Sequence, residues 1–400
     1  MNCDQHQNSR RKMEISTSLS LALMHSEGSS ELVRNALSRA LDIAVMQGDF
    51  ACELQLLSGL FMHYRGSIEV GAALDIASRS KEVALKTNDR DDMALAEWML
   101  GGSHHLAGNH LIALEHFQSG LRYTASGSRF RAGQDLFHHS SLLLVGMARS
   151  LLFRGLLEDS ADYAKRAIEE GEKSNHSATL CRSLSLVISV YLALADSRRS
   201  EGYIALLTDL ATAYSLKPYR AVANGLRGQW LLLQNDLREG VMLLKRALEE
   251  LHVHRHEVLN MDFICDLGAA LVAMGEHEEA LAITLKAIDV QRRGERLLYL
   301  PALLRMKGLI LASRSVGDYA EAEESLLSAI DWAKRQFATL LELTAATDLA
   351  ELLRKQGRMP EACAYLSAAF DRMPTQIVSP AHRRAQQILN QLRSGINAVG

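Results

Sequence analysis

The amino-acid sequence predicts an all-α protein built as a solenoid of stacked antiparallel helix pairs. One observation is a unit of two short helices around a tight turn, seen best in Gly268–Ile288 (GAALVAMGEHEEALAITLKAI). A second is that this unit recurs along the chain at a nearly constant spacing. A third is that no run alternates polar and apolar residues for long enough to form a strand. With only five prolines in 400 residues, few helices are interrupted.

The turn at Gly275 defines the template. Gly268 lies seven residues before it, and Ala280 and Ile288 follow it by five and thirteen residues. A small residue on each helix lets two antiparallel helices approach closely, and apolar residues at helical spacing fill the interface. Similar spacing surrounds the positions 66, 108, 155, 195, 235, 317 and 357, and successive turns are 40 to 47 residues apart.

The expected elements follow from this template in chain order. Residues 1–12 are polar, and we expect them to be disordered. The expected helix pairs are 19–24 with 31–47, 50–65 with 68–87, 91–106 with 110–124, 132–153 with 157–173, 176–194 with 199–214, 218–233 with 237–251, 257–274 with 277–292, 296–313 with 319–335, and 338–355 with 359–371. Pro374 and Pro380 close the array, and Ala381–Arg393 gives a polar-faced capping helix within 380–395. We expect 13–395 to be one repeat domain.

A period of about 40 residues exceeds the 34 residues of the standard tetratricopeptide repeat and overlaps HEAT and armadillo lengths. The small residues around each turn favour a tetratricopeptide unit with lengthened helices. We therefore predict a right-handed, tetratricopeptide-like superhelical solenoid of about eight to nine helix pairs.

Composition limits the partners. The formal net charge is −3 and the calculated pI is about 6.6, which disfavours direct nucleic-acid binding. No apolar run is long enough to cross a bilayer, so we expect no membrane partner. No C-x-x-C occurs, and scattered free thiols are typical of a reducing cytoplasm. The cysteines are Cys3, Cys52, Cys181, Cys265 and Cys363.

Sequence motifs of catalysis are absent. The chain contains no Gly-Lys dipeptide and so no phosphate loop, and it has no G-x-G-x-x-G, G-x-S-x-G or H-E-x-x-H. No titratable cluster indicates an unrecognised hydrolase. We therefore predict that the protein is not an enzyme, and that it has no catalytic residues and no cofactor.

Histidines are frequent, at fifteen, and raise the question of a metal site. His252, His254 and His256 alternate near a helix end, but without recognised ligand spacing, so a solvated loop is the preferred interpretation. Neighbours such as His104 and His105 diverge by about 100° on a helix and do not face one ion easily. We predict no metal site.

The first helix of each pair is expected to line a concave groove. Taking the small residue before each turn as the seam, positions −6, −3, +1 and +4 from it face inward. A groove mixing aromatic, basic and acidic groups suits a peptide or a small effector. A solvated groove without a dedicated ligand is the alternative. The candidate residues are Glu53, His63, Trp98, His105, Arg149, Gln229, Asp262, Cys265, Arg305, Glu351 and Arg354.

Residues 320–373 carry a family resemblance. The run AEESLLSAI at 322–330, the run ELTAATDLA at 342–350, and the Gly357-Arg358 turn followed by Glu361, Ala362 and Cys363 resemble the terminal helical repeats of bacterial signal-transduction ATPases. Those proteins join a winged-helix or adenylate cyclase domain to an ATPase and then to tetratricopeptide-like repeats. Nothing in this chain resembles their catalytic or DNA-binding domains. The resemblance implies a sensor or interaction module that acts with separate domains.

Two functions are consistent with these features. The first is a non-enzymatic scaffold that binds a protein or peptide partner in bacterial signalling or transcriptional regulation. The alternative is a small-molecule effector-sensing module of a transcriptional regulator or cyclase, with its ligand near Trp98 and His105.

Overall fold

Helices make up nearly all of the chain that the computed structural model describes, namely residues 31–399 without 68, 125–138, 255, 257–258, 315–318 and 375–378. No strand occurs in this described part, which confirms the all-α prediction. The predicted disorder of 1–12 and the predicted helix at 19–24 lie outside the described residues, as does the predicted turn at Gly317.

The helices are α2 (Glu31–Gln47), α3 (Phe50–Gly66), α4 (Val70–Thr87), α5 (Arg90–Leu106), α6 (His110–Thr124), α7 (His139–Phe153), α8 (Leu157–Lys173), α9 (Ser177–Ala193), α10 (Ser197–Ala213), α11 (Lys217–Leu233), α12 (Leu237–Val253), α13 (Asn260–Ala273), α14 (His277–Arg293), the 3₁₀ helix η1 (Leu297–Tyr299), α15 (Leu300–Arg314), α16 (Ala320–Arg335), α17 (Thr339–Lys355), α18 (Met359–Arg372) and α19 (Pro380–Val399). These bounds follow the predicted pairs closely, and the capping helix is longer than expected.

Left-handed backbone at single residues ends the first helix of most pairs. Gly108, Gly155, Gly275 and Gly357 have φ between 72° and 84°, a region that glycine enters without a steric penalty. Ala195 and Asn235 take the same role at φ of 54° and 64°. These predicted turns are therefore confirmed. Gly66 differs, because it is the last residue of α3 and Ser67 caps that helix.

Small residues let the two helices of a pair approach each other. A Cβ on Gly228 would lie 3.0 Å from the carbonyl oxygen of Gly240 on α12, and one on Gly308 would lie 3.1 Å from that of Ala322 on α16. Gly59 is an exception, since a Cβ there would meet Leu37 of the preceding helix α2 at 3.0 Å. The close packing predicted from glycine spacing is thus present, and in α3 it faces the other neighbour.

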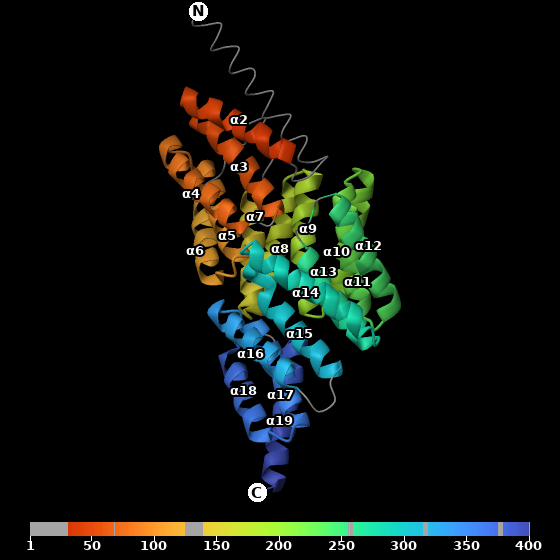
Figure 1. The fold of residues 1–400 in the computed structure, drawn as a ribbon. Helices are drawn as coiled ribbons and strands as arrows, with labels where there is room; N and C mark the ends of the chain where they lie inside the picture. Colours follow the sequence, from red (N-terminus) through yellow and green to blue (C-terminus); the bar gives the residue numbers. More distant parts are fainter. Residues whose placement is uncertain are drawn as a thin grey trace, which may run out of the picture.

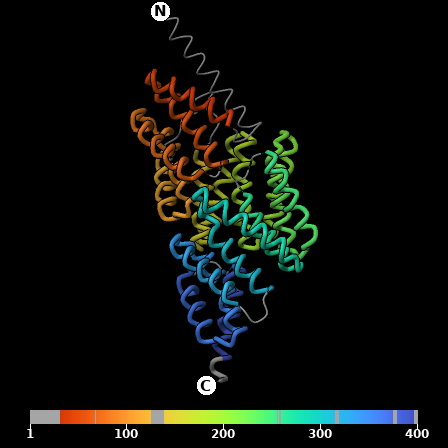
Figure 2. The backbone as a smooth tube through the Cα atoms, in the orientation of Figure 1, coloured from red at the N-terminus to blue at the C-terminus, as the bar shows by residue number. Residues whose placement is uncertain are grey.

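The helix pairs wind into a superhelix (Figure 1). From α3–α6 on one side, the chain passes behind through α7 and α8, returns along α10–α12 on the other side, and crosses the front as α13 and α14. The last pairs and α19 lie beneath, as the tube in Figure 2 shows. This path confirms the predicted helical-repeat solenoid.

Successive turns of the superhelix touch each other. The amide of Val70 donates to the carbonyl oxygen of Gly294 at 3.2 Å, and the hydroxyl of Thr339 donates to the carbonyl oxygen of Arg154 at 2.5 Å. The side chain of Gln336 packs on Gly108. Each contact joins loops about five helix pairs apart along the chain. The inner surface is therefore covered where the turns meet, instead of forming an open groove.

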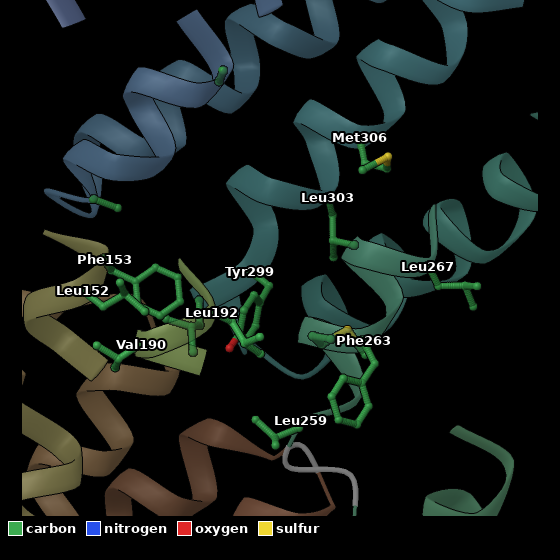
Figure 3. Close-up of a cluster of buried hydrophobic side chains, with 14 of the residues drawn as sticks. Leu152, Phe153, Val190, Leu192, Leu259, Phe263, Leu267, Tyr299, Leu303 and Met306 are labelled. Carbon is green, nitrogen blue, oxygen red and sulfur yellow. The ribbon is translucent and has the colours of Figure 1, made fainter. Parts of the chain in front are cut away.

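Two clusters of buried apolar side chains form the core. The smaller runs from α2 to α7, and the larger runs from α7 to α19 and also includes Val70 of α4 and Leu106 of α5. Leu121 and Tyr163 pack against both. Figure 3 shows part of the larger cluster, in which Tyr299 lies beside Leu192 and close to Phe153. None of the helices in the described chain combines the length and apolar character needed to span a bilayer.

Candidate ligand-binding site

A small cavity lies where the superhelix closes on itself. Its volume is about 50 Å³. Its polar walls come from Arg65 on α3, His105 on α5, Arg149 on α7, and the pair Arg296 and Tyr299 just before α15. Elements from both turns of the superhelix therefore build one site, which no single repeat could form.

Arg149 is the central polar group of this site. Its guanidinium donates to the hydroxyl of Ser189 at 2.9 Å, to the carbonyl oxygen of Leu186 at 3.2 Å and to the carboxylate of Asp262 at 3.2 Å. It also donates to the hydroxyl of Tyr299. Burial alone would lower the pKa of Arg149, but Tyr299 and Asp262 raise it above its ordinary value, so the side chain stays charged. Arg149 thus links α7, α9, α13 and η1.

Aromatic rings form the apolar wall. The rings of Phe61 and Trp98 meet edge to face with centroids 5.2 Å apart. Behind the lining residue Tyr299, Phe153 packs against its ring with centroids 5.7 Å apart and stacks on His110 at 5.0 Å. Such edge-to-face and stacked pairs fix ring positions beyond simple burial. Phe153 and Tyr299 of this group are seen in Figure 3.

The histidines beside the cavity are uncharged. His105 exchanges a hydrogen bond with the hydroxyl of Ser150 at 2.9 Å, and burial lowers its pKa well below the ordinary value. Burial lowers the pKa of His110 to about 3, helped by the nearby Arg154. His104 turns the other way and stacks on His116 of α6, with centroids 5.5 Å apart. The predicted divergence of His104 and His105 is therefore present.

A second polar group lies further along the inner surface. Gln229 of α11 donates to the carboxylate of Asp266 on α13, and burial raises the pKa of Asp266 to about 6. Burial and the neighbouring aspartates raise the pKa of the Cys265 thiol well above its ordinary value. Arg305 of α15 pairs with the buried carboxylate of Asp348 on α17. These groups extend a polar strip from the cavity toward the C-terminal helices.

The predicted groove residues divide between these places. Trp98, His105 and Arg149 line the cavity, and Asp262 reaches it through Arg149. Gln229, Cys265 and Arg305 belong to the second polar group, with Cys265 and Arg305 close enough to interact electrostatically.

The remaining four predicted residues lie elsewhere. Glu53 pairs with Arg79 on the partner helix α4 at 2.7 Å. His63 is buried, and burial lowers its pKa below the ordinary value. Glu351 contacts Arg384 of α19 at 2.5 Å, and Arg354 is exposed. The structure therefore does not bring these four into the cavity.

Arg65, Arg296 and Tyr299 line the cavity but were absent from the sequence prediction. Arg65 lies six residues after Gly59, outside the offsets used, and Arg296 and Tyr299 lie in the connection before α15. Their role arises from contact between turns, for which the repeat pattern carries no signal.

The cysteines and the histidines considered in the sequence can be located in the structure. Cys52, Cys181, Cys265 and Cys363 are free thiols, as predicted, and Cys3 lies outside the described residues. His256 is less solvated than predicted, since its ring packs on Tyr219 with centroids 5.5 Å apart. Over the described ranges, no three His, Cys, Asp or Glu side chains are grouped so as to hold a metal ion.

No protein-family model matches the chain, and no curated protein matches it. Solved structures do resemble it. A Rap protein complexed with competence and sporulation factor gives a TM-score of 0.60 at 13% identity, covering 96% of this chain and 99% of that one. The Rap conjugation gene regulator of plasmid pLS20, in complex with the Phr* peptide, gives 0.54 at 13% identity, covering 98% of each chain.

The apo form of the quorum sensor NprR from B. thuringiensis gives a TM-score of 0.52 at 13% identity, covering 90% of this chain and 98% of that one. At such low identity these likenesses show the fold alone. They agree with the helix pairs described above, so the chain is similar in architecture to these tetratricopeptide-like helical-repeat proteins.

Proposed function

We propose that this protein is a non-enzymatic scaffold that binds a peptide, or a short segment of a partner protein, inside its superhelix in bacterial signalling or transcriptional regulation. The observation that carries this proposal is the cavity closed by both turns of the superhelix, with aromatic and cationic walls. Two of the structurally similar proteins were solved with competence and sporulation factor and with the Phr* peptide. Their likeness in architecture supports an interior ligand here.

The polar strip offers groups that an extended peptide uses. The side-chain carbonyl oxygen of Gln229 is buried and has no donor among the described residues. A buried acceptor without a donor costs about 1–3 kcal/mol, and a peptide N–H would relieve that cost. The carboxylates of Asp262 and Asp266 on α13 lie on the same strip. A peptide passing from the cavity along α13 would meet all three groups.

The test is capture of peptides from a randomised library, with bound sequences identified by mass spectrometry. We expect a limited set of related sequences to be retained, and Gln229→Leu to reduce their affinity about 10-fold because a main-chain hydrogen bond is lost, at about 1.4 kcal/mol per tenfold. Lys165→Gln, whose side chain is 70% exposed on the outer helix α8, is the matched control. Retention of no sequence above background would contradict the proposal.

Small-molecule sensing is the second candidate, favoured by the position of Trp98 and His105 on the cavity wall. The cavity volume of about 50 Å³ is far below the roughly 300–1,000 Å³ of typical ligand pockets. A whole effector would therefore require the superhelix to open. A metabolite screen by thermal shift tests this, because a ligand at 100 times its Kd adds about 2.7 kcal/mol of stability.

The proposal extends to separate effector domains. The resemblance of 320–373 to the repeats of signal-transduction ATPases supports action as a sensor module beside a winged-helix or cyclase ATPase. Co-purification of such a protein with this chain is the expected result, and a neighbouring reading frame that encodes one would supply the candidate.

A further inference from the structure

Arg65 is a partly buried cation without a counter-ion. It makes no hydrogen bond and no ion pair with any residue in the described ranges of the chain. It sits near the C-terminal end of α3 and forms part of the cavity wall. Arg149 and Arg305, by contrast, each reach a carboxylate, those of Asp262 and Asp348. A charged group taken out of water without a partner is costly, so this position calls for an explanation.

Other cations surround Arg65. Arg149 and Arg296 line the same cavity, and Arg182 of α9 is within electrostatic range. Burial, and then these three guanidiniums, lower the pKa of Arg65 to about 9, which still leaves it charged at neutral pH. Burial is also the main cause that lowers the pKa of His256 to about 4, and the nearby charges of Arg182 and Arg65 lower it further. Three guanidiniums thus line the cavity from α3, α7 and the loop before α15, and that of Arg182 on α9 lies within electrostatic range.

We infer that the arginine cluster that lines the cavity, Arg65, Arg149 and Arg296, binds an oxyanion at the closing point of the superhelix. This inference rests on the proposed function in one respect, namely that a ligand enters the superhelix. It adds the chemistry of the anchoring group, a carboxylate or phosphate. Guanidiniums suit that group because their planar donors match two oxygens at once.

The size and walls of the cavity agree with this occupant. A volume of about 50 Å³ is more than the roughly 30 Å³ share of one water and far less than a whole ligand requires. The space fits one terminal group, while the remainder of a ligand would follow the polar strip. Tyr299 stays protonated because burial raises the pKa of its hydroxyl well above the ordinary value, so it adds a neutral polar group beside the cations.

A bound anion would also stabilise the charged form of Arg65. It would compensate the repulsion from Arg149, Arg182 and Arg296 and give the free guanidinium donors an acceptor. Two sources supply the same chemistry: the C-terminal carboxylate of a bound peptide, and a free oxyanion such as inorganic phosphate.

The first experimental arm uses inorganic phosphate alone. Thermal unfolding of the full chain is followed in sodium phosphate and in sodium chloride at equal ionic strength. We expect phosphate to raise the Tm of the wild type and to lose this effect in Arg65→Gln, a change that breaks no existing ion pair. Arg293→Gln removes the same charge from an 80% exposed side chain on α14 and should keep the phosphate response.

The second arm uses a randomised peptide library without Asp and Glu, offered with free C-terminal carboxylates or with amidated termini. If the carboxylate is the anchoring group, only the free-acid peptides are retained, and Arg65→Gln weakens them at least tenfold. A phosphate response without peptide retention would keep the oxyanion site and contradict the proposed peptide function.

The reverse result separates the two ideas equally well. Peptides that bind regardless of amidation and of Arg65→Gln, together with no phosphate response, would overturn the oxyanion site and leave the peptide-binding function in place.

Discussion

Replacement of Arg149 by Met should separate the two turns of the superhelix. The substitution keeps the length and the apolar stem of the side chain but removes the guanidinium that joins α7 to Asp262 on α13 and to Tyr299 on η1. The side chains of Arg149 and Asp262 are 7% and 16% exposed. After the change, the carboxylate of Asp262 remains largely buried without its cation.

Breaking a buried ion pair by removing one partner typically costs about 3–5 kcal/mol. Asp262 keeps some contact with water and the nearby Tyr299 hydroxyl, which places the expected loss at the lower end, about 3 kcal/mol. A double variant that also carries Asp262→Asn should recover part of this loss, because no unpaired charge is left. We expect a coupling energy of at least about 1.5 kcal/mol between the two positions.

Urea denaturation, monitored by circular dichroism, measures the loss of unfolding free energy. Amide hydrogen exchange of residues 297–314 is the local readout. A second spectroscopic probe checks that unfolding remains a single transition, since repeat arrays can lose cooperativity. Arg246→Met is the control, because its i,i+4 pair with Glu250 is 67% exposed at the arginine and is worth about 0.3–0.5 kcal/mol. A loss for Arg149→Met no larger than that of the control, or unchanged exchange at 297–314, would refute the role of Arg149.

Two further predictions concern packing and pH. Gly146→Ala should cost about 1–2 kcal/mol in urea denaturation, because its Cβ would lie 2.4 Å from the ring of Phe117, whereas Gly202→Ala, with nothing within 4 Å, should gain about 0.5–1 kcal/mol of helix stability. Equal effects of the two would contradict the packing argument. The folded-state pKa of His110 is about 3 against 6.5 unfolded, so the unfolded chain binds the extra proton and stability falls as pH drops below about 6.5. Between pH 7 and 5 the wild type should lose about 2 kcal/mol more than His110→Phe, measured by urea denaturation at each pH, and parallel pH profiles would contradict the burial of His110.

The local fold was predictable because each unit carries its own signals. The turn glycines at 108, 155, 275 and 357 have positive φ. Glycine adopts positive φ without a steric penalty, so its position in the sequence indicates the turn. Asn235 and Ala195 also have positive φ. Asparagine adopts this conformation less often than glycine, and alanine has no polar side chain to stabilise it. Both turns were nevertheless predicted from the repeat spacing. Helix bounds therefore follow from local sequence, as expected of an array in which each pair packs on its neighbours.

The site was predictable only in part. Offsets from the seam found Trp98, His105 and Arg149, because these face the axis of the superhelix in each local unit. The same offsets in α3 selected Glu53, which pairs with Arg79 on α4, because Gly59 packs toward α2 instead of its own partner helix. When a glycine packs on the preceding helix instead of its partner helix, offsets counted from that glycine select residues on a different face of the helix.

Closure of the superhelix is the part that no repeat encodes. The position of Arg296 against Arg65 depends on the rotation accumulated over about five helix pairs, so small differences in each pair decide whether the turns meet. The contacts between turns combine backbone and polar contacts, such as Val70 with Gly294 and Thr339 with Arg154, with the ring contact of Phe153 and Tyr299. Neighbouring pairs share continuous apolar cores. A ligand larger than the closing cavity would have to change the pitch of the superhelix, and this would couple its binding to the shape of the whole surface offered to a partner.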